Sequence, residues 1–81
     1  MIDERVFTEM HVLAKFNLDT NLEGIKVHSS ADPEIVEATR RLFEKGLVTQ
    51  QDGGYLTSLG RIASEHTQDL FRILDVEVSV E

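Results

Sequence analysis

One segment, Ala38–Ala63, constrains the fold more than any other part of the chain. An amphipathic pattern runs up to Gly46, an Asp-Gly-Gly turn then separates two short apolar runs, and a new helical pattern begins at Thr57. Glycine takes the left-handed conformation that ends a helix at little cost, and Asp-Gly between apolar runs is a strong hairpin signal. The segment therefore predicts a helix, a β-hairpin and a returning helix in close succession.

The helix that leads into this hairpin has the clearest start in the chain. Asp32 suits the N-cap and Pro33 the first helical position, because Asp accepts unpaired backbone donors and Pro lacks one. The apolar residues Ile35, Val36, Leu42 and Phe43, together with Thr39, fall on one face at the helical period. We therefore predict a helix over residues 32–45 that ends at Gly46.

Two helices and a candidate strand are expected before that helix. Residues 3–16 carry an apolar stripe at helical spacing, formed by Val6, Met10, Leu13 and Ala14 with Phe7 beside it. Thr20 and Glu23 have capping-box spacing and predict a short helix of one or two turns. Residues 26–28 are a candidate strand that would join the hairpin.

After the hairpin, Thr57 or Ser58 should cap a last helix. Its apolar stripe contains Leu59, Ile62, Ala63, His66, Leu70, Ile73 and Leu74. An apolar stripe on a helix normally faces the core. From Asp75 onward the pattern alternates, which is typical of a strand or of a frayed acidic terminus. We therefore expect one domain over residues 1–75, and a tail over 76–81 that is strand-like or disordered.

These elements together predict a mainly α fold with a small β-hairpin. Three helices, a short wing and a C-terminal helix in this order are typical of a winged helix-turn-helix, a shape that often binds DNA. The chain has 81 residues, 41% of them hydrophobic, which suffices for one small core. It shows no membrane-spanning run and no signal-peptide pattern, so the cytoplasm is the expected location.

Enzymatic function is disfavoured by the residue pattern. The chain has no cysteine, and its histidines at 11, 28 and 66 lack a zinc-binding spacing. The Gly-Gly pair belongs to the hairpin and no lysine follows it, unlike a phosphate-binding loop. His66 lies in the apolar stripe of the last helix, where we expect a buried or half-buried structural histidine. We therefore expect no catalytic site, no metal site and no cofactor.

Charge gives conflicting indications about double-stranded DNA. The net charge is −7, whereas phosphate binding relies on Lys and Arg. The central residues 25–50 hold four acidic and four basic side chains and are neutral, and both flanking parts are acidic. The candidate DNA-binding residues all lie in this central part: Lys26, His28, Ser29, Ser30, Arg40 and Arg41.

Two features weigh against DNA binding. Glu37 precedes Arg41 by four residues and Arg40 precedes Glu44 by four, which is the spacing of ion pairs on a helix surface. Such pairs would occupy both guanidinium groups. The expected wing tip, Gln50-Gln51-Asp52, carries no positive charge. The alternative interpretation is a protein-interaction module that never contacts DNA.

The C-terminal part also suggests association between two copies. Phe71 lies to one side of the apolar stripe, where it could either contact a second copy or complete the core. Val76, Val78 and Val80 alternate with polar residues and could pair with a sheet edge of a second copy. We therefore treat Phe71, Val76, Val78 and Val80 as candidate dimer contacts.

The sequence between Leu22 and Leu74 resembles a specific family. The KVH segment, the ADP helix start, the EKGL helix end and the DGGYLTSLG hairpin are similar to those of small, roughly 80-residue gammaproteobacterial proteins. The EKGLV and YLTSLG runs more distantly resemble the helix-wing-helix part of MarR-like and ArsR-like repressors. The resemblance implies a winged helix and a DNA-binding transcriptional regulator, without identifying its target. The leading interpretation is a DNA-binding regulator, for which a homodimer is one candidate assembly. The alternative is a module that binds a partner protein in place of DNA.

Overall fold

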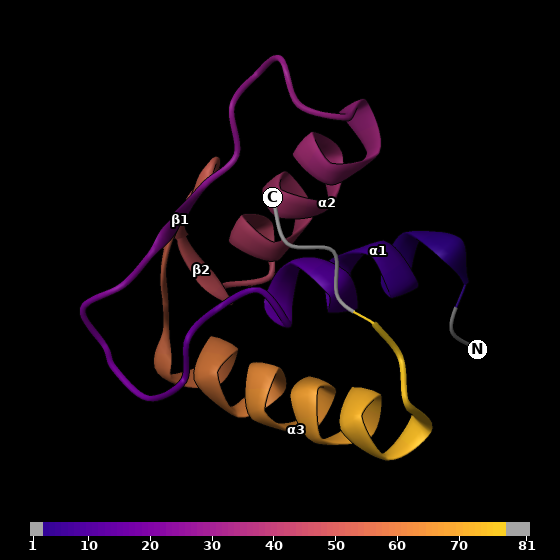
Figure 1. Ribbon diagram of the computed structural model, residues 1–81. Helices are drawn as coiled ribbons and strands as arrows, with labels where there is room; N and C mark the ends of the chain where they lie inside the picture. Colours follow the sequence, from indigo (N-terminus) through magenta and orange to yellow (C-terminus); the bar gives the residue numbers. More distant parts are fainter. Residues whose placement is uncertain (1–2, 78–81) are drawn as a thin grey trace.

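The computed structural model describes residues 3–77. Its helices are α1 (Glu4–Leu13), α2 (Pro33–Glu44) and α3 (Ser58–Leu74). Its strands are β1 (Ile25–Lys26), β2 (Val48–Gln50) and β3 (Gly53–Leu56), and they form one antiparallel sheet in the order β1-β3-β2. The fold is therefore mixed, with helices dominant, as the sequence pattern predicts (Figure 1).

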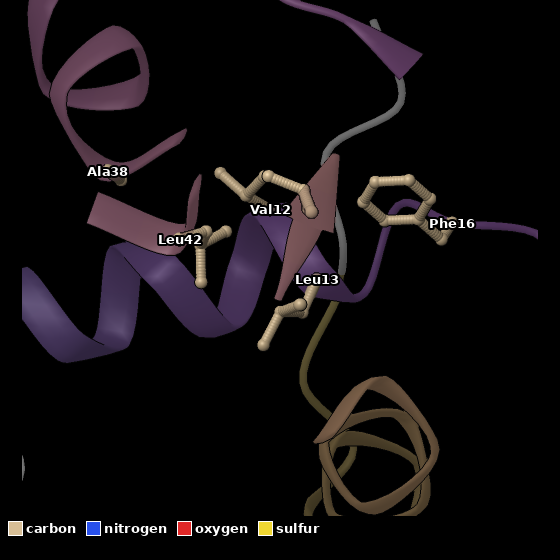
Figure 2. Packing of buried hydrophobic residues seen from close by; sticks show 6 residues of the cluster. Val12, Leu13, Phe16, Ala38 and Leu42 are labelled. Carbon is tan, nitrogen blue, oxygen red and sulfur yellow. The ribbon is translucent and has the colours of Figure 1, made fainter. Parts of the chain in front are cut away.

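Helix α1 lies between the other two helices and packs against both (Figure 1). Its buried residues Val12 and Leu13, and Phe16 just beyond its end, form the core together with Ala38 and Leu42 of α2 (Figure 2). Val48 of β2 closes this cluster. The predicted stripe is largely misplaced, because Leu13 is its one buried member: Val6, Met10 and Ala14 are half-buried and Phe7 is exposed. The buried residues Val12 and Phe16 lie outside that stripe, so the buried side of this segment is rotated relative to the prediction.

The predicted ends of α2 and the predicted start of α3 agree with the structure, whereas α1 ends at Leu13 and not near Phe16. Asp32 caps α2 by accepting a hydrogen bond from the backbone N–H of Glu34 at 2.9 Å. Gly46 has a φ of 79°, and the following N–H of Leu47 donates to the carbonyl of Leu42. Thr57 caps α3 by accepting from the N–H of Gly60 at 3.0 Å. Local capping chemistry therefore determines where α2 and α3 begin and where α2 ends.

The hairpin forms as predicted, but it belongs to a three-stranded sheet. β1 is shorter than the candidate strand 26–28 and pairs with β3 through Ile25 opposite Gly54 and Lys26 opposite Gly53. Gly53 has a φ of 122°, and a Cβ there would lie 2.6 Å from the carbonyl oxygen of Ile25. The glycine therefore allows β1 to approach β3.

The short helix predicted from Thr20 and Glu23 is wrong. Residues 17–22 form turns, in which the Thr20 hydroxyl accepts from the N–H of Leu22 and Asn17 accepts from Asp19. The side chain of Glu23 instead accepts from the amide of Asn17 at 2.6 Å. A threonine can stabilise a turn as well as a helix start, and here the turn prevails.

The apolar stripe of α3 does not face the core. The buried residues of α3 lie outside the stripe and are Gly60, Ser64, Thr67 and Phe71. The large apolar residues of the stripe are exposed: Leu59, Ile62, Leu70, Ile73 and Leu74. Gly60 lies so close to Leu47, the residue before β2, that a Cβ would be 1.8 Å from its carbonyl oxygen. Ser64 donates to the carbonyl of Leu13 at 2.6 Å, and Gln68 donates to that of Phe16 at 2.8 Å. Close packing at Gly60 and the hydrogen bonds from Ser64 and Gln68 to these two carbonyls hold the helix in this rotation.

Candidate functional site

Four of the six candidate DNA-binding residues surround one shallow hollow. Lys26, His28, Ser29 and Arg40 line a cavity of about 390 Å³ whose other walls are Val27, Val36, Gln51 and Asp52. The turn that follows β1 carries His28 and Ser29 to the side of α2 on which Arg40 lies. Ser30 is exposed in the same turn but does not line the hollow. The fold therefore brings these residues together.

Arg41 points away from this hollow. Its Nε donates to Oε2 of Glu9 in α1 at 2.8 Å, and its Nη2 donates to the carbonyl of Arg5 at 3.3 Å. Lys45, one turn further along α2, binds the other oxygen of Glu9. Arg41 is therefore part of the α1–α2 contact, and its guanidinium is occupied within the protein.

The predicted surface ion pairs have different partners in the structure. Arg40 lies 3.6 Å from Glu37, three residues before it, and not beside the predicted partner Glu44, four residues after it. Both side chains of the pair are about half exposed. Arg41 pairs with Glu9 instead of Glu37. Exposed pairs of the Arg40 kind contribute little, so this guanidinium can still exchange partners.

Glu9 is a buried acid at the centre of the α1–α2 contact. Glu9 exposes 4% of its surface to solvent. Burial by itself would raise the pKa of Glu9, but hydrogen bonds from Lys45 and Arg41 and their positive charges act in the other direction. The resulting pKa lies below the ordinary value of a glutamate, so Glu9 is a permanent anion near neutral pH.

The outer face of α2 is acidic as a result. The residues Glu34, Glu37 and Glu44 are exposed there. Arg40 is also exposed on this side and, unlike Arg41 and Lys45, does not bind Glu9. With the cluster of Glu9, Arg41 and Lys45 included, four acidic groups stand against three basic groups on this side of α2, so it offers no net positive charge to a phosphate backbone. The wing tip at Gln51 and Asp52 adds another negative charge.

The exposed side of α3 is a second candidate site. We name the set Leu59, Ile62, His66, Leu70 and Ile73 the α3 apolar face. Its apolar members are 57%, 51%, 40% and 75% exposed in that order, and His66 is exposed as well. The prediction of a buried or half-buried histidine at position 66 is therefore wrong. Exposed apolar side chains gathered along one helix are typical of a protein-contact surface.

The candidate dimer contacts of the C-terminal part lie elsewhere. Phe71 is 3% exposed and stacks against His11 and Phe7, with ring centroids 5.1 Å and 6.0 Å away, so it completes the core. The N–H of Val76 donates to the carbonyl of Phe71 at 2.8 Å and closes the end of α3 in place of starting a strand. Val78 and Val80 lie outside the described residues.

The match to a known family covers most of the chain. A family of unknown function, DUF5669, matches residues 1–75. The chain belongs to this family. No curated protein and no solved structure gives a significant match. The description of this family names no activity.

Metal-binding clusters and membrane-spanning helices were looked for among the described residues of this DUF5669 chain. Within residues 3–77, no three side chains of the metal-binding types lie close enough to hold an ion together. None of the described helices is both long enough and apolar enough to cross a membrane. Two surfaces of the described residues are considered as functional sites, the hollow beside α2 and the α3 apolar face.

Sequence reasoning missed Glu9 and misplaced the α3 apolar face. Glu9 gave no local signal, because its partners Arg41 and Lys45 lie more than 30 residues away. A signal for α3 was present: the small residues Gly60 and Ser64 are four apart, which indicates a helix side that approaches a neighbour closely. The larger apolar residues on the adjacent side obscured it.

Proposed function

We propose that this chain is a winged-helix module that associates with protein through the α3 apolar face. The hairpin after α2, the sheet order β1-β3-β2 and the returning helix α3 support a winged-helix arrangement. Between β1 and α2 the chain forms a turn, in which the N–H of Ala31 donates to the carbonyl of His28 at 2.9 Å; a helix-turn-helix would have a helix in this place. The functional conclusion rests on one observation, the exposure of the α3 apolar face.

The energetic argument is one of unburied surface. The exposed fractions of the four apolar residues in the α3 apolar face add up to more than the full surface of two residues. Full burial of a leucine or isoleucine stabilises by about 1.5–3 kcal/mol, so covering the face would gain about 3–7 kcal/mol before the cost of association. The helix cannot rotate this face inward, because Gly60 and Ser64 hold the opposite side against Leu47 and Leu13.

A matched pair of variants tests this function. The double variant Ile62→Glu/Ile73→Glu places two charges on the α3 apolar face, and Tyr55→Glu charges a similarly exposed position on β3. We expect affinity capture from an extract of the source organism to enrich the same protein with wild type and with Tyr55→Glu, and to lose it with the double variant. Enrichment that survives the double variant would contradict association through α3.

DNA binding is the second candidate function, because Lys26, His28 and Arg40 converge on one hollow. Fluorescence anisotropy with a mixed-sequence duplex separates the two functions. The α3 proposal predicts no saturable binding at about 50 mM or about 200 mM salt. Binding that weakens steeply with salt and is lost in Lys26→Ala/Arg40→Ala would establish the DNA function instead. Arg41→Ala is unsuitable for this test, because Arg41 is bound to Glu9.

A further inference from the structure

The hollow beside α2 gathers polar side chains that the fold itself does not use. The side chains of Lys26, His28 and Ser29 line it, and none of them forms a hydrogen bond or an ion pair with another described residue. Other cations of the chain are occupied, since Arg41 and Lys45 bind the same buried carboxylate. The donors of the hollow are therefore available to a ligand.

The hollow combines positive charge with an apolar wall. Lys26 and Arg40 carry the charge, and the ion pair of Arg40 with Glu37 is exposed and 3.6 Å long, so a ligand can displace it. Val27 and Val36 are half-buried and form the apolar part. The volume of about 390 Å³ lies within the range of small-molecule sites, in which a few polar groups stand beside apolar side chains.

We infer that the hollow binds a nucleoside monophosphate, a ligand with one phosphate and one flat, partly apolar base. The phosphate carries a charge of about −1.5 to −2 near neutral pH. This charge is complementary to Lys26 and Arg40, and a guanidinium can bind a phosphate through two parallel hydrogen bonds. The hydroxyl of Ser29 supplies a further donor, and the base packs against Val27 and Val36.

The hairpin tip supplies groups that suit a base. Gln51 and Asp52 belong to the wall of the hollow, and the N–H of Val27 donates to the carbonyl of Asp52 at 2.8 Å. This hydrogen bond fixes the tip beside the turn that follows β1. The carboxylate of Asp52 accepts hydrogen bonds and repels a phosphate, so it requires a donor from another part of the ligand. The amino group of a base such as adenine is a donor of this kind.

The charges around the hollow favour a single phosphate over a nucleic acid. A duplex carries one negative charge for about every 1.7 Å of its axis, so it would extend beyond the hollow onto α2. That side of α2 has no net positive charge, because Glu34, Glu37 and Glu44 are exposed there and Arg41 is bound to Glu9. A nucleoside monophosphate needs only the local charge of the hollow.

The shape of the hollow predicts the strength of binding. A shallow hollow covers one side of the ligand, so we expect a dissociation constant on the order of 100 µM. Each cation makes a charge-assisted contact, and the loss of one such contact should weaken binding by about tenfold.

A titration of the isotope-labelled full chain with adenosine monophosphate, followed by NMR in phosphate-free buffer, measures both affinity and location. We expect saturable shifts at the backbone amides of residues 26–29, Arg40, Gln51 and Asp52. Shifts that concentrate on another part of the chain would overturn the inference. The absence of saturable shifts up to about 10 mM ligand would also overturn it.

Matched variants test the two cations. Lys26→Ala and Arg40→Ala should each bind adenosine monophosphate about tenfold more weakly. Arg72→Ala removes the same charge from an exposed position on α3 and should keep the wild-type affinity. All three replaced side chains are exposed, so the circular dichroism spectra should match that of wild type. Wild-type affinity in both hollow variants, or equal weakening in Arg72→Ala, would overturn the inference.

Related ligands test which parts of the nucleotide are bound. Adenosine lacks the phosphate and inorganic phosphate lacks the base, so both should bind at least about tenfold more weakly than adenosine monophosphate. Equal binding of adenosine would overturn the phosphate contact, and equal binding of inorganic phosphate would overturn the nucleoside as part of the ligand. A mixed-sequence duplex should not displace adenosine monophosphate at about 200 mM salt, and displacement would overturn the small ligand in favour of a nucleic acid.

The hollow shares no residue with the α3 apolar face. Ile62→Glu/Ile73→Glu should therefore bind adenosine monophosphate with the wild-type affinity. A failed titration would overturn the nucleotide site and leave association through α3 standing. A failed capture experiment would overturn association through α3 and leave the nucleotide site standing.

Discussion

Arg41 of α2 and Glu9 of α1 are joined by a hydrogen bond of 2.8 Å that crosses the contact between the two helices. Lys45 binds the second carboxylate oxygen of Glu9. The carboxylate is 5% exposed, while Arg41 is 27% and Lys45 51% exposed. Both cations can therefore keep part of their hydration, which lowers the cost of burying the acid.

Neutralising Glu9 should weaken the fold. Glu9→Gln keeps the shape but removes the charge that pairs with Arg41 and Lys45. We expect the free energy of unfolding to fall by about 2 kcal/mol, because hydrogen bonds to charged groups contribute about 1.5–3 kcal/mol. Urea titration measures this loss. The exposed Glu44→Gln is the matched control, and an equal effect of the two substitutions would contradict a special role for Glu9.

The same group makes stability depend on pH. The pKa of Glu9 is lower in the folded chain than in the unfolded chain, so the unfolded chain binds the proton more readily. The stabilisation is therefore complete above the unfolded value, about 4.3, and is lost as the pH falls through the folded pKa. The stability difference between wild type and Glu9→Gln should narrow between about pH 6 and about pH 3. A difference that stays constant would show that charge on Glu9 is not its source.

The two arginines of α2 should behave differently. Arg41→Ala leaves the buried Glu9 with one cationic partner, so we expect a loss of about 1–3 kcal/mol in thermal or urea unfolding. Arg40→Ala breaks an exposed pair and should change stability by about 0.5 kcal/mol or less. Similar losses at both positions would mean that Arg41 does not hold α1 to α2.

Gly60 provides a test in which helix propensity and packing predict opposite signs. Alanine is a better helix former than glycine by about 1 kcal/mol, so propensity alone predicts that Gly60→Ala stabilises the chain. The added Cβ would lie 1.8 Å from the carbonyl oxygen of Leu47, so α3 would have to move away from β2. We expect a net loss of about 2–4 kcal/mol in the free energy of unfolding. Glu65→Ala on the exposed side of α3 is the control, and a gain in stability at Gly60 would contradict the close packing.

Local chemistry made the helix ends and the hairpin predictable from sequence. Asp32, Gly46 and Thr57 each act on backbone groups within a few residues, so their patterns can be read without knowing the neighbours in space. Thr20 shows the limit of such signals, because the same side chain caps a turn in the structure. The candidate strand at residues 26–28 is confirmed in part by β1, which pairs with β3. The hollow at Lys26, His28 and Arg40 could not be predicted, because it depends on how the turn after β1 lies beside α2.

The sequence by itself determined the helix–hairpin–helix succession of Ala38–Ala63, because capping and turn preferences are local. Only the tertiary structure decided which sides of those helices are free. Arg41 is occupied because Glu9, 32 residues earlier, lies against it. The apolar stripe of α3 is exposed because Gly60 permits a closer approach to Leu47 than a larger residue could make. Both outcomes arise from contacts between distant segments, and no periodicity within one helix encodes them.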